Sequence, residues 1–197
     1  MTEVMALIEQ WQKRYNHIRS RSSETYVMKI NNTSPIYQEI QHFRQLWVWV
    51  LMLFISVLCI YGAIQQLIMG KPFGNNPASD SMLIVITIIF GFGFPVFMYK
   101  IHLTTEVHED GLYFRYFPLH LSFRKINLED IAGFNVETYR AIIDYGGWGI
   151  KYGRKGQAYN VSGNRGVQLQ LSDGKRILIG SQRAEELAEA LKSALRK

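Results

Sequence analysis

Charged residues are missing from two long stretches of this sequence. Residues 46–69 read LWVWVLMLFISVLCIYGAIQQLIM and residues 82–99 read MLIVITIIFGFGFPVFMY, and neither contains Asp, Glu, Lys or Arg. About 18 or more uncharged, mostly apolar residues are enough to cross the hydrocarbon core of a bilayer as a helix. The alternative is a pair of helices buried in a soluble core, but such helices usually carry a polar face. The absence of charge therefore predicts an integral membrane protein with a transmembrane hairpin.

Cysteine is nearly absent, and neither sign of charge forms a block. The single cysteine, Cys59, excludes a disulfide within the chain and fits a domain in a reducing compartment. The chain has 22 Lys and Arg against 16 Asp and Glu, a net charge of +6. This distribution does not indicate nucleic-acid binding. The mild basic excess suits either an anionic lipid surface or an ordinary solvated surface.

Sequence motifs for catalysis are missing as well. The chain has no GxxxxGK[ST] phosphate loop, no GxSxG serine motif and no paired carboxylates in an apolar context. His102, His108 and His120 come without a cysteine partner and without an HxxxH pair, so they do not predict a metal site. We therefore expect no catalytic residue, no metal and no cofactor, and a protein that is not an enzyme.

The segment between the two stretches predicts their orientation. Residues 70–81 read GKPFGNNPASDS, a composition typical of a turn, so both chain ends lie on one side of the membrane. Arg44 and Lys100 flank the hairpin on that side, whereas the turn has only Lys71, offset by Asp80. The positive-inside rule then predicts cytoplasmic N- and C-termini.

Two helices are expected ahead of the first apolar stretch. Apolar residues at helical spacing over residues 4–18 predict an amphipathic helix. It lies either on the membrane surface or against the tail domain or a partner. Residues 37–44, YQEIQHFR, predict the start of the helix that enters the membrane. Arg44 would then lie at the interface, with Trp47 and Trp49 just inside as aromatic anchors.

The remainder of the chain changes to a period of two, which is typical of β-strands. The order indicates about seven antiparallel strands, with Asp110-Gly111 and Asp173-Gly174 as turns, and then an amphipathic C-terminal helix. Alternation predicts strands in these segments: 102–109, 112–117, 119–124, 134–140, two within 145–160, 167–171 and 175–179. The sequence thus divides into an N-terminal segment, the hairpin and a tail domain: residues 1–45, 46–99 and 100–197.

This order of elements resembles the pleckstrin-homology-like (PH-like) domain, a bent antiparallel sheet or barrel capped by a C-terminal helix. The whole chain resembles small uncharacterised prokaryotic membrane proteins that carry two membrane helices and then such a domain, and this resemblance implies the plasma membrane of a prokaryote as the location. No activity is established for that family, and the fold hosts many functions. The resemblance rests on four segments: YQEIQHFRQLWVW at 37–49, GGWGIKYG at 146–153, YNVSGNRGVQLQL at 159–171 and ILIGSQRAEEL at 177–187.

A glycine-rich motif stands out in the tail. Gly146, Gly147 and Gly149 surround Trp148. The glycines would allow a tight bend with Trp148 in the domain core. Alternatively, Trp148 lies at the membrane interface or in a ligand-binding mouth.

Basic residues close to this motif are candidates for a lipid- or partner-binding surface, although the sequence favours an ordinary solvated loop. The candidates are Lys151, Arg154, Lys155, Arg124, Lys125 and Arg165. The sequence favours a non-enzymatic membrane-anchored PH-like module that binds a protein partner or anionic lipid headgroups at the cytoplasmic face. The alternative is an accessory or assembly subunit of a larger membrane complex. The expected partners are the bilayer and a membrane protein or a second copy of the chain.

Overall fold

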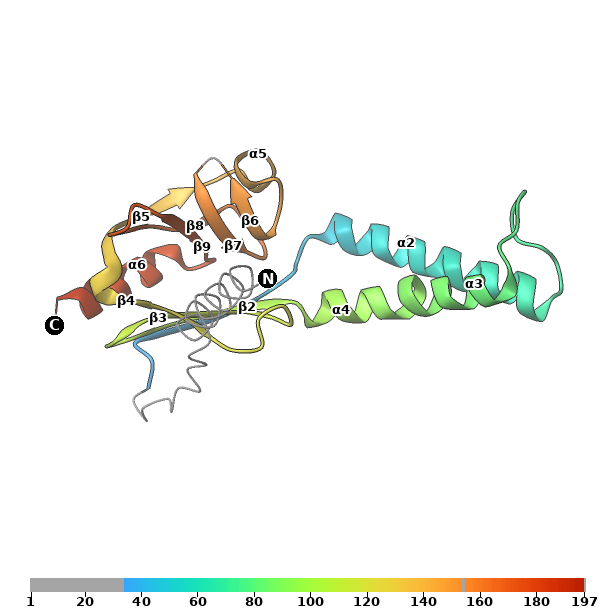
Figure 1. Ribbon diagram of the computed structural model, residues 1–197, viewed down its shortest axis with the longest axis horizontal. Coiled ribbons are helices and arrows are strands. Elements are labelled where there is room, and N and C mark those ends of the chain that lie inside the picture. Colours follow the sequence, from blue (N-terminus) through green and yellow to red (C-terminus); the bar gives the residue numbers. More distant parts are fainter. Residues whose placement is uncertain (1–33, 154, 197) are drawn as a thin grey trace, which may run out of the picture. The chain divides into compact units, whose positions relative to one another are not determined.

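The computed structural model describes residues 34–153 and 155–196, and these form an α+β structure (Figure 1). It contains two apolar helical runs, two β-sheets and a C-terminal helix. The α+β class expected from the sequence is therefore confirmed. The amphipathic helix predicted for residues 4–18 lies outside the described residues.

The two helical runs coincide with the two uncharged stretches. Leu46–Ile68 and Asp80–Lys100 are each long and apolar enough to cross a membrane. The turn expected between them, residues 70–81, corresponds to the non-helical connection 69–79, except that residues 80 and 81 already belong to the second run. The first run consists of α2 (Leu46–Ala63) and the π-helical η1 (Ile64–Ile68), and the second of α3 (Asp80–Ile86), the π-helical η2 (Thr87–Gly93) and α4 (Phe94–Lys100).

Small side chains let the two runs approach closely. A Cβ added at Gly91 would lie 3.9 Å from the Cβ of Cys59 on the facing run. Two hydroxyls bond across the contact: Thr87 Oγ1 donates to the Cys59 carbonyl at 3.2 Å, and Ser56 Oγ to the Phe90 carbonyl at 3.2 Å. Most other apolar side chains of the runs face outward, as they do in helices surrounded by lipid.

The prediction of a helix over residues 37–44 is wrong, because Tyr37–His42 form strand β1. Alternate residues Tyr37, Glu39 and Gln41 are buried, which is the period of a strand and not of a helix. β1 pairs antiparallel with β2, the first strand after the apolar runs, from Tyr37↔Val107 to His42↔His102. The sheet therefore begins ahead of the helices and resumes after them.

Sheet A has the strand order β1-β2-β3-β4, and every neighbouring pair is antiparallel. The hairpin predicted at Asp110-Gly111 joins β2 to β3. The strand expected at 119–124 is wrong over most of its length: residues 118–123 form a loop, and only Arg124 begins a strand. The strands after β1 are β2 (His102–His108), β3 (Gly111–Phe117) and β4 (Arg124–Asn127).

Sheet B has the order β5-β8-β9-β7-β6. β7 and β9 pair in parallel, which corrects the expectation of a wholly antiparallel sheet. β9 follows β8 along the chain and lies between β8 and β7. It runs antiparallel to β8 and in the same direction as β7. After the short turn η3 (Leu128–Asp130), the strands are β5 (Ile131–Thr138), β6 (Gly149–Gly153), β7 (Gly156–Asn160), β8 (Arg165–Leu171) and β9 (Arg176–Gly180).

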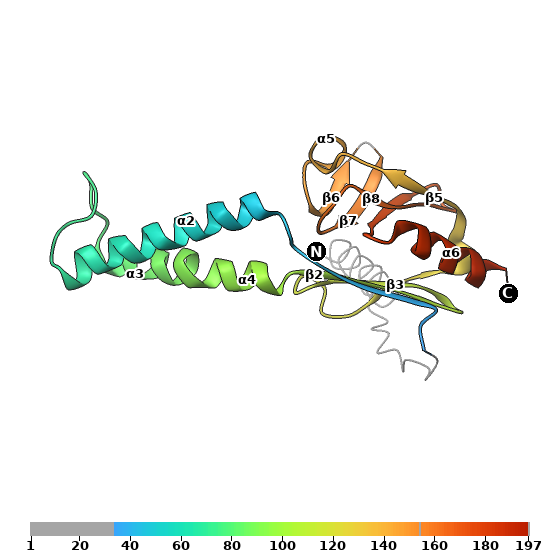
Figure 2. The ribbon, with the colours of Figure 1, turned by 180° about the vertical axis from the view of Figure 1, so that it is seen from behind.

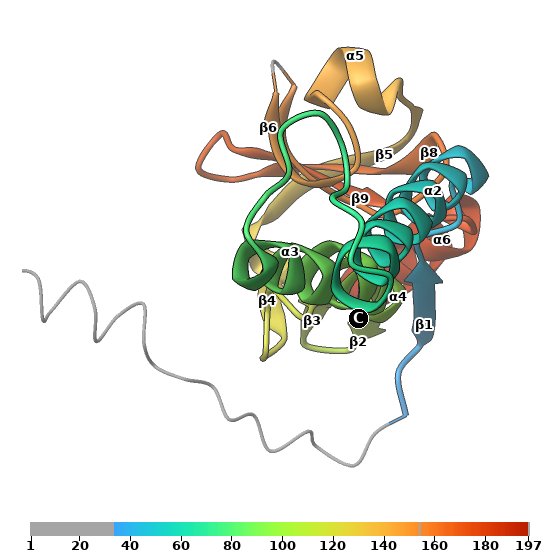
Figure 3. The same cartoon turned by 90° about the vertical axis from the view of Figure 1, so that its right-hand side faces the viewer.

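Two helices cover the sheets. α6 (Ala184–Leu195) lies between sheets A and B and contacts β1, β2, β5 and β8 (Figure 2). Its buried face includes Leu187 and Leu191, as predicted, and also Ala190. The short helix α5 (Ala141–Tyr145), which the sequence did not predict, lies on the side of sheet B that faces away from sheet A (Figure 3).

Burial follows these layers. The main core lies between the two sheets and α6, and its fully buried members include Leu103, Leu112, Leu169 and Leu187. A smaller cluster lies on the other side of sheet B, and it consists of Tyr139, Ala141, Tyr145, Ala158 and Leu178, with Trp148 packed against it.

A buried carboxylate holds β1 to the turn before α6. Glu39 accepts hydrogen bonds from Tyr37 Oη at 2.7 Å, from Ser181 Oγ at 2.6 Å and from the Gln182 backbone N–H at 2.9 Å. Burial raises the pKa of Tyr37, so its hydroxyl remains a donor to the carboxylate. β1 of sheet A is thereby bonded to the segment that follows β9 of sheet B.

We predict that Glu39→Ala destabilises the folded domain. The substitution leaves buried donors without an acceptor, which costs about 2–3 kcal/mol for bonds to a charged group. Denaturant unfolding of the full chain in detergent, followed by tryptophan fluorescence, measures the loss. Gln38→Ala is the matched control. It removes an exposed side chain that bonds to Glu106 at the surface and keeps the Gln38 carbonyl that accepts from Arg183, so it should change stability by less than about 0.5 kcal/mol. Equal stability of the two variants would contradict the role of Glu39.

Candidate functional site

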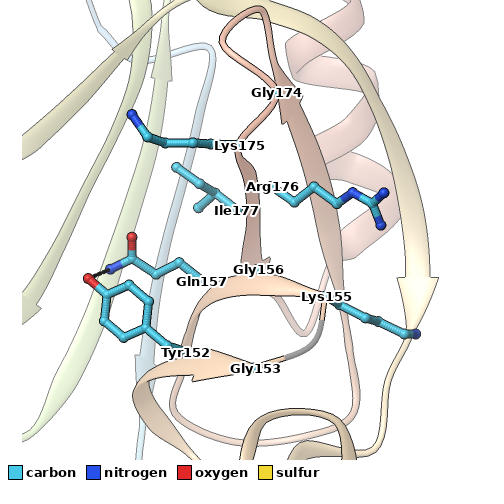
Figure 4. Close-up of a pocket in the computed structure, with 9 residues that line it drawn as sticks. All are labelled: Tyr152, Gly153, Lys155, Gly156, Gln157, Gly174, Lys175, Arg176 and Ile177. Atoms are coloured by element: carbon cyan, nitrogen blue, oxygen red, sulfur yellow. Dashed lines mark hydrogen bonds between the residues drawn. The ribbon is translucent and has the colours of Figure 1, made fainter.

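An open hollow of about 400 Å³ lies between the β6–β7 turn and the β8–β9 turn (Figure 4). Tyr152, Gln157 and Lys175 extend from one side of these strands, whereas Lys155 and Arg176 extend from the other. The hollow combines an aromatic ring, an amide and cations beside glycine backbone. Its full lining is Tyr152, Gly153, Lys155, Gly156, Gln157, Gly174, Lys175, Arg176 and Ile177.

A chain of hydrogen bonds connects the hollow to sheet A. Gln157 Nε2 donates to Tyr152 Oη at 2.9 Å and to Tyr159 Oη at 2.6 Å. Arg124, at the start of β4, donates from Nη1 to the same Tyr159 oxygen at 3.0 Å. Burial raises the pKa of Tyr159 despite the opposing charge of Arg124, so the phenol stays neutral. Tyr152 remains 79% exposed at the rim and can contact a ligand.

Glycine is required where the two turns meet. Gly156 has a φ of +108°, and a Cβ there would lie 2.3 Å from the Arg176 carbonyl oxygen. No side chain fits so close to backbone, so the β6–β7 turn packs directly on the start of β9.

The basic residues predicted from the sequence do not form one surface. Lys125 bonds to Asp110 at 2.8 Å, beside the β2–β3 turn, and Arg124 is bonded to Tyr159 in the chain described above. Arg165 pairs with Glu185 at the start of α6. Arg124 and Lys125 are neighbours on β4 and Arg165 is on β8, and all three are already bonded, which lowers their availability for an anionic ligand.

Two further residues of the predicted basic group, Lys151 and Lys155, lie near α5 or the hollow. Lys155 pairs with Glu137 and lies 4.0 Å from Asp144, and its hydrogen bond to Glu137 raises the pKa of the lysine. Lys151 lies on β6 and pairs with Ala158, a member of the smaller cluster. Arg154 lies outside the described residues. Of the five candidates among the described residues, the structure therefore brings only Lys155 to the hollow.

The glycine-rich motif shapes the connection from α5 to β6. Gly146 ends α5 at a φ of +77°, and Gly147 and Gly149 follow at +127° and +123°. Trp148 is partly buried against the smaller cluster, and its Nε1 donates to the Gly163 carbonyl at 3.1 Å. The structure thus places Trp148 on the outer side of sheet B, outside the main core between the sheets.

The three histidines considered as metal ligands lie at separate places. His102 stacks on Phe117, His108 contacts Glu106 at 3.1 Å, and His120 lies beside Tyr159 with 5.9 Å between ring centroids. Within residues 34–153 and 155–196, no three His, Cys, Asp or Glu side chains gather as a metal site would require.

In a comparison with protein families, residues 28–197 match the "Family of unknown function (DUF6141)". The chain belongs to this family. The matched region begins ahead of β1 and includes both apolar runs, both sheets and α6, so β1 is part of the unit that defines a DUF6141 protein. No curated protein matches the chain.

Sequence reasoning missed most of the hollow in this DUF6141 protein. Tyr152 lies on β6, Gln157 on β7, Lys175 in the turn before β9 and Arg176 on β9, and they meet because β9 inserts beside β7. The two glycine-containing turns, RKG at 154–156 and DGK at 173–175, were visible in the sequence. Nothing in the alternation of the strands indicated a parallel contact between the strands that follow them.

We predict that Gly156→Ala destabilises the domain more than Gly163→Ala. Both glycines have a positive φ, so alanine costs about 1–2 kcal/mol at either position. Only Gly156 faces backbone within 3 Å, whereas a Cβ at Gly163 meets nothing within 4 Å. Thermal melting of the two variants in detergent compares them. Equal losses would show that the β6–β7 turn does not pack on β9 as described.

Proposed function

We propose that this DUF6141 protein is a membrane-anchored module whose PH-like domain binds a protein partner at the cytoplasmic face. Two sheets with a C-terminal helix between them support the PH-like assignment. The two apolar helical runs, with most apolar side chains facing outward, support the membrane anchor. The anchor and the domain are joined without a linker, since α4 ends at Lys100 and β2 begins at His102.

Side chains at the helix ends support the proposed orientation. Trp47 is exposed at the start of α2, and Trp49 Nε1 donates to the Phe43 carbonyl at 3.0 Å, next to Arg44. Lys100 closes the second run at the same end. Aromatic and basic residues together are typical of the cytoplasmic interface.

Cysteine labelling tests the anchor. In a chain with Cys59→Ala, we expect Asn75→Cys in the connection between the runs and Ser172→Cys after β8 to react with a membrane-impermeant maleimide from opposite sides of the membrane. Right-side-out and inverted vesicles distinguish the two sides. Labelling of both positions in the same vesicle preparation would contradict the transmembrane hairpin.

The exposed Tyr152 beside the open hollow is the observation that supports a protein partner over a lipid headgroup. Tyrosine and arginine are enriched among residues that contribute most to protein interfaces, and Arg176 lines the same hollow. Anionic lipid binding needs several available cations on one surface. Among the predicted basic residues, Lys125, Lys155 and Arg165 are paired with carboxylates on different elements.

We predict that Tyr152→Ala weakens partner binding by about tenfold or more, the effect typical of a central interface tyrosine. A photo-crosslinking residue at Gln157 should capture the partner in intact cells, and Tyr152→Ala should lower the yield. Tyr152→Phe is the control, because it keeps the ring and removes only the hydroxyl bonded to Gln157. An unchanged yield with Tyr152→Ala would contradict binding at the hollow.

An accessory subunit of a larger membrane complex is the second candidate, and Gly93 favours it. A Cβ added there would meet only the carbonyl of Ile88 in its own run, whereas Gly91 packs against the facing run. Gly93 thus leaves a small surface that a helix of another protein could approach. A stoichiometric membrane partner that co-purifies with Tyr152→Ala but is lost with Gly93→Leu would support this function.

A further inference from the structure

The loop between β3 and β4 exposes two leucines. Leu119 is 58% exposed and Leu121 is 81% exposed, within the loop formed by residues 118–123. Single exposed apolar residues are ordinary on protein surfaces. Leu119 and Leu121 are separated by one residue, and together they form an apolar projection on a short loop. The position of this loop in the fold suggests what the two leucines contact.

Strand pairing places this loop beside the end of the second helical run. α4 ends at Lys100, Ile101 follows it, and His102 begins β2. His102 pairs with Phe117, the last residue of β3, and their rings stack with 5.2 Å between centroids. The loop therefore begins next to the helix end, as the chain path in Figure 1 shows.

The distance from the helix end to the leucines is short. Lys100 and His102 are two residues apart, and Leu121 follows Phe117 by four residues, so the loop can extend by at most about 14 Å. The headgroup region on each side of the hydrocarbon core is about 5–8 Å thick. A loop that starts at the helix end can therefore reach the interface.

The charge around the loop suits an anionic interface. Residues 115–125 read RYFPLHLSFRK and contain no acidic residue. Arg115 lies over the Phe123 ring at 4.7 Å, and Arg124 is exposed at the start of β4. Apolar side chains flanked by cations are typical of segments that lie in the lipid headgroup layer.

We propose that the β3–β4 loop inserts Leu119 and Leu121 into the headgroup and acyl boundary of the bilayer that the helices cross. The partner of this surface is the membrane itself, which makes it distinct from the hollow. The inference rests on the proposed membrane anchor. It adds a third attachment point that fixes the edge of sheet A against the lipid.

Depth-dependent quenching tests the proposal in the full chain. Single cysteines in a Cys59→Ala background carry the fluorophore NBD, and the chain is reconstituted in vesicles of phosphatidylcholine and phosphatidylglycerol that contain doxyl-labelled lipid. The test positions are Leu119→Cys and Leu121→Cys. Ile36→Cys is the matched apolar control. Ile36 is 42% exposed, and its backbone N–H donates to the Val107 carbonyl at the end of sheet A that is farther from the helices. Val57→Cys, in the middle of α2, reports on the anchor.

We expect strong quenching at Val57, clear quenching at both loop positions and little at Ile36. Because the labels lie at different depths in the bilayer, quenching at the loop positions should exceed quenching at Ile36 by about twofold or more. Quenching at Val57 with both loop positions equal to Ile36 would overturn the loop insertion and leave the anchor intact. Absence of quenching at Val57 would overturn the anchor and, with it, the insertion. Because the loop positions are exposed, the labels do not disturb the core.

Discussion

The pairing of β1 with β2 is the contact on which the rest of the structure depends. β1 precedes the two apolar runs and β2 follows them. Their antiparallel register, from Tyr37↔Val107 to His42↔His102, brings the start of the first run and the end of the second to the same end of sheet A. The two helical runs are thus held together by the hydrogen bonds between β1 and β2 as well as by contacts between the helices. β1 is also bonded to sheet B, because Gln41 Nε2 donates to the Gly180 carbonyl at 2.6 Å.

This arrangement determines how the domain is attached. No flexible linker separates α4 from β2, and Gln45 at the start of α2 donates to the Val161 carbonyl at 2.9 Å. A long tether would let a binding domain sample many positions, whereas two short covalent connections and a cross-sheet bond fix it. The hollow at Tyr152 and the β3–β4 loop are consequently held at defined places relative to the helices.

The sequence predicted the parts whose signal is local. The uncharged runs, the Asp110-Gly111 turn and the apolar face of α6 depend on composition or on short periods, and the structure contains them. β1 was missed because YQEIQHFR contains polar residues that bury by bonding to a distant segment, as Glu39 does with Ser181. The hollow was missed for a similar reason: the parallel pairing of β7 and β9 is set by tertiary packing.

A disulfide across β1 and β2 tests the central claim most directly. Gln38 and Glu106 are paired residues whose side chains bond at 2.8 Å, so cysteines at both positions in a Cys59→Ala background lie within the reach of a disulfide. Mild oxidation of the full chain should form this bond, detected as a mobility shift on non-reducing gels. The pair Gln38→Cys and Thr104→Cys, which is out of register by two residues, should form far less. Equal reaction of the two pairs, or no reaction of the first, would contradict the account.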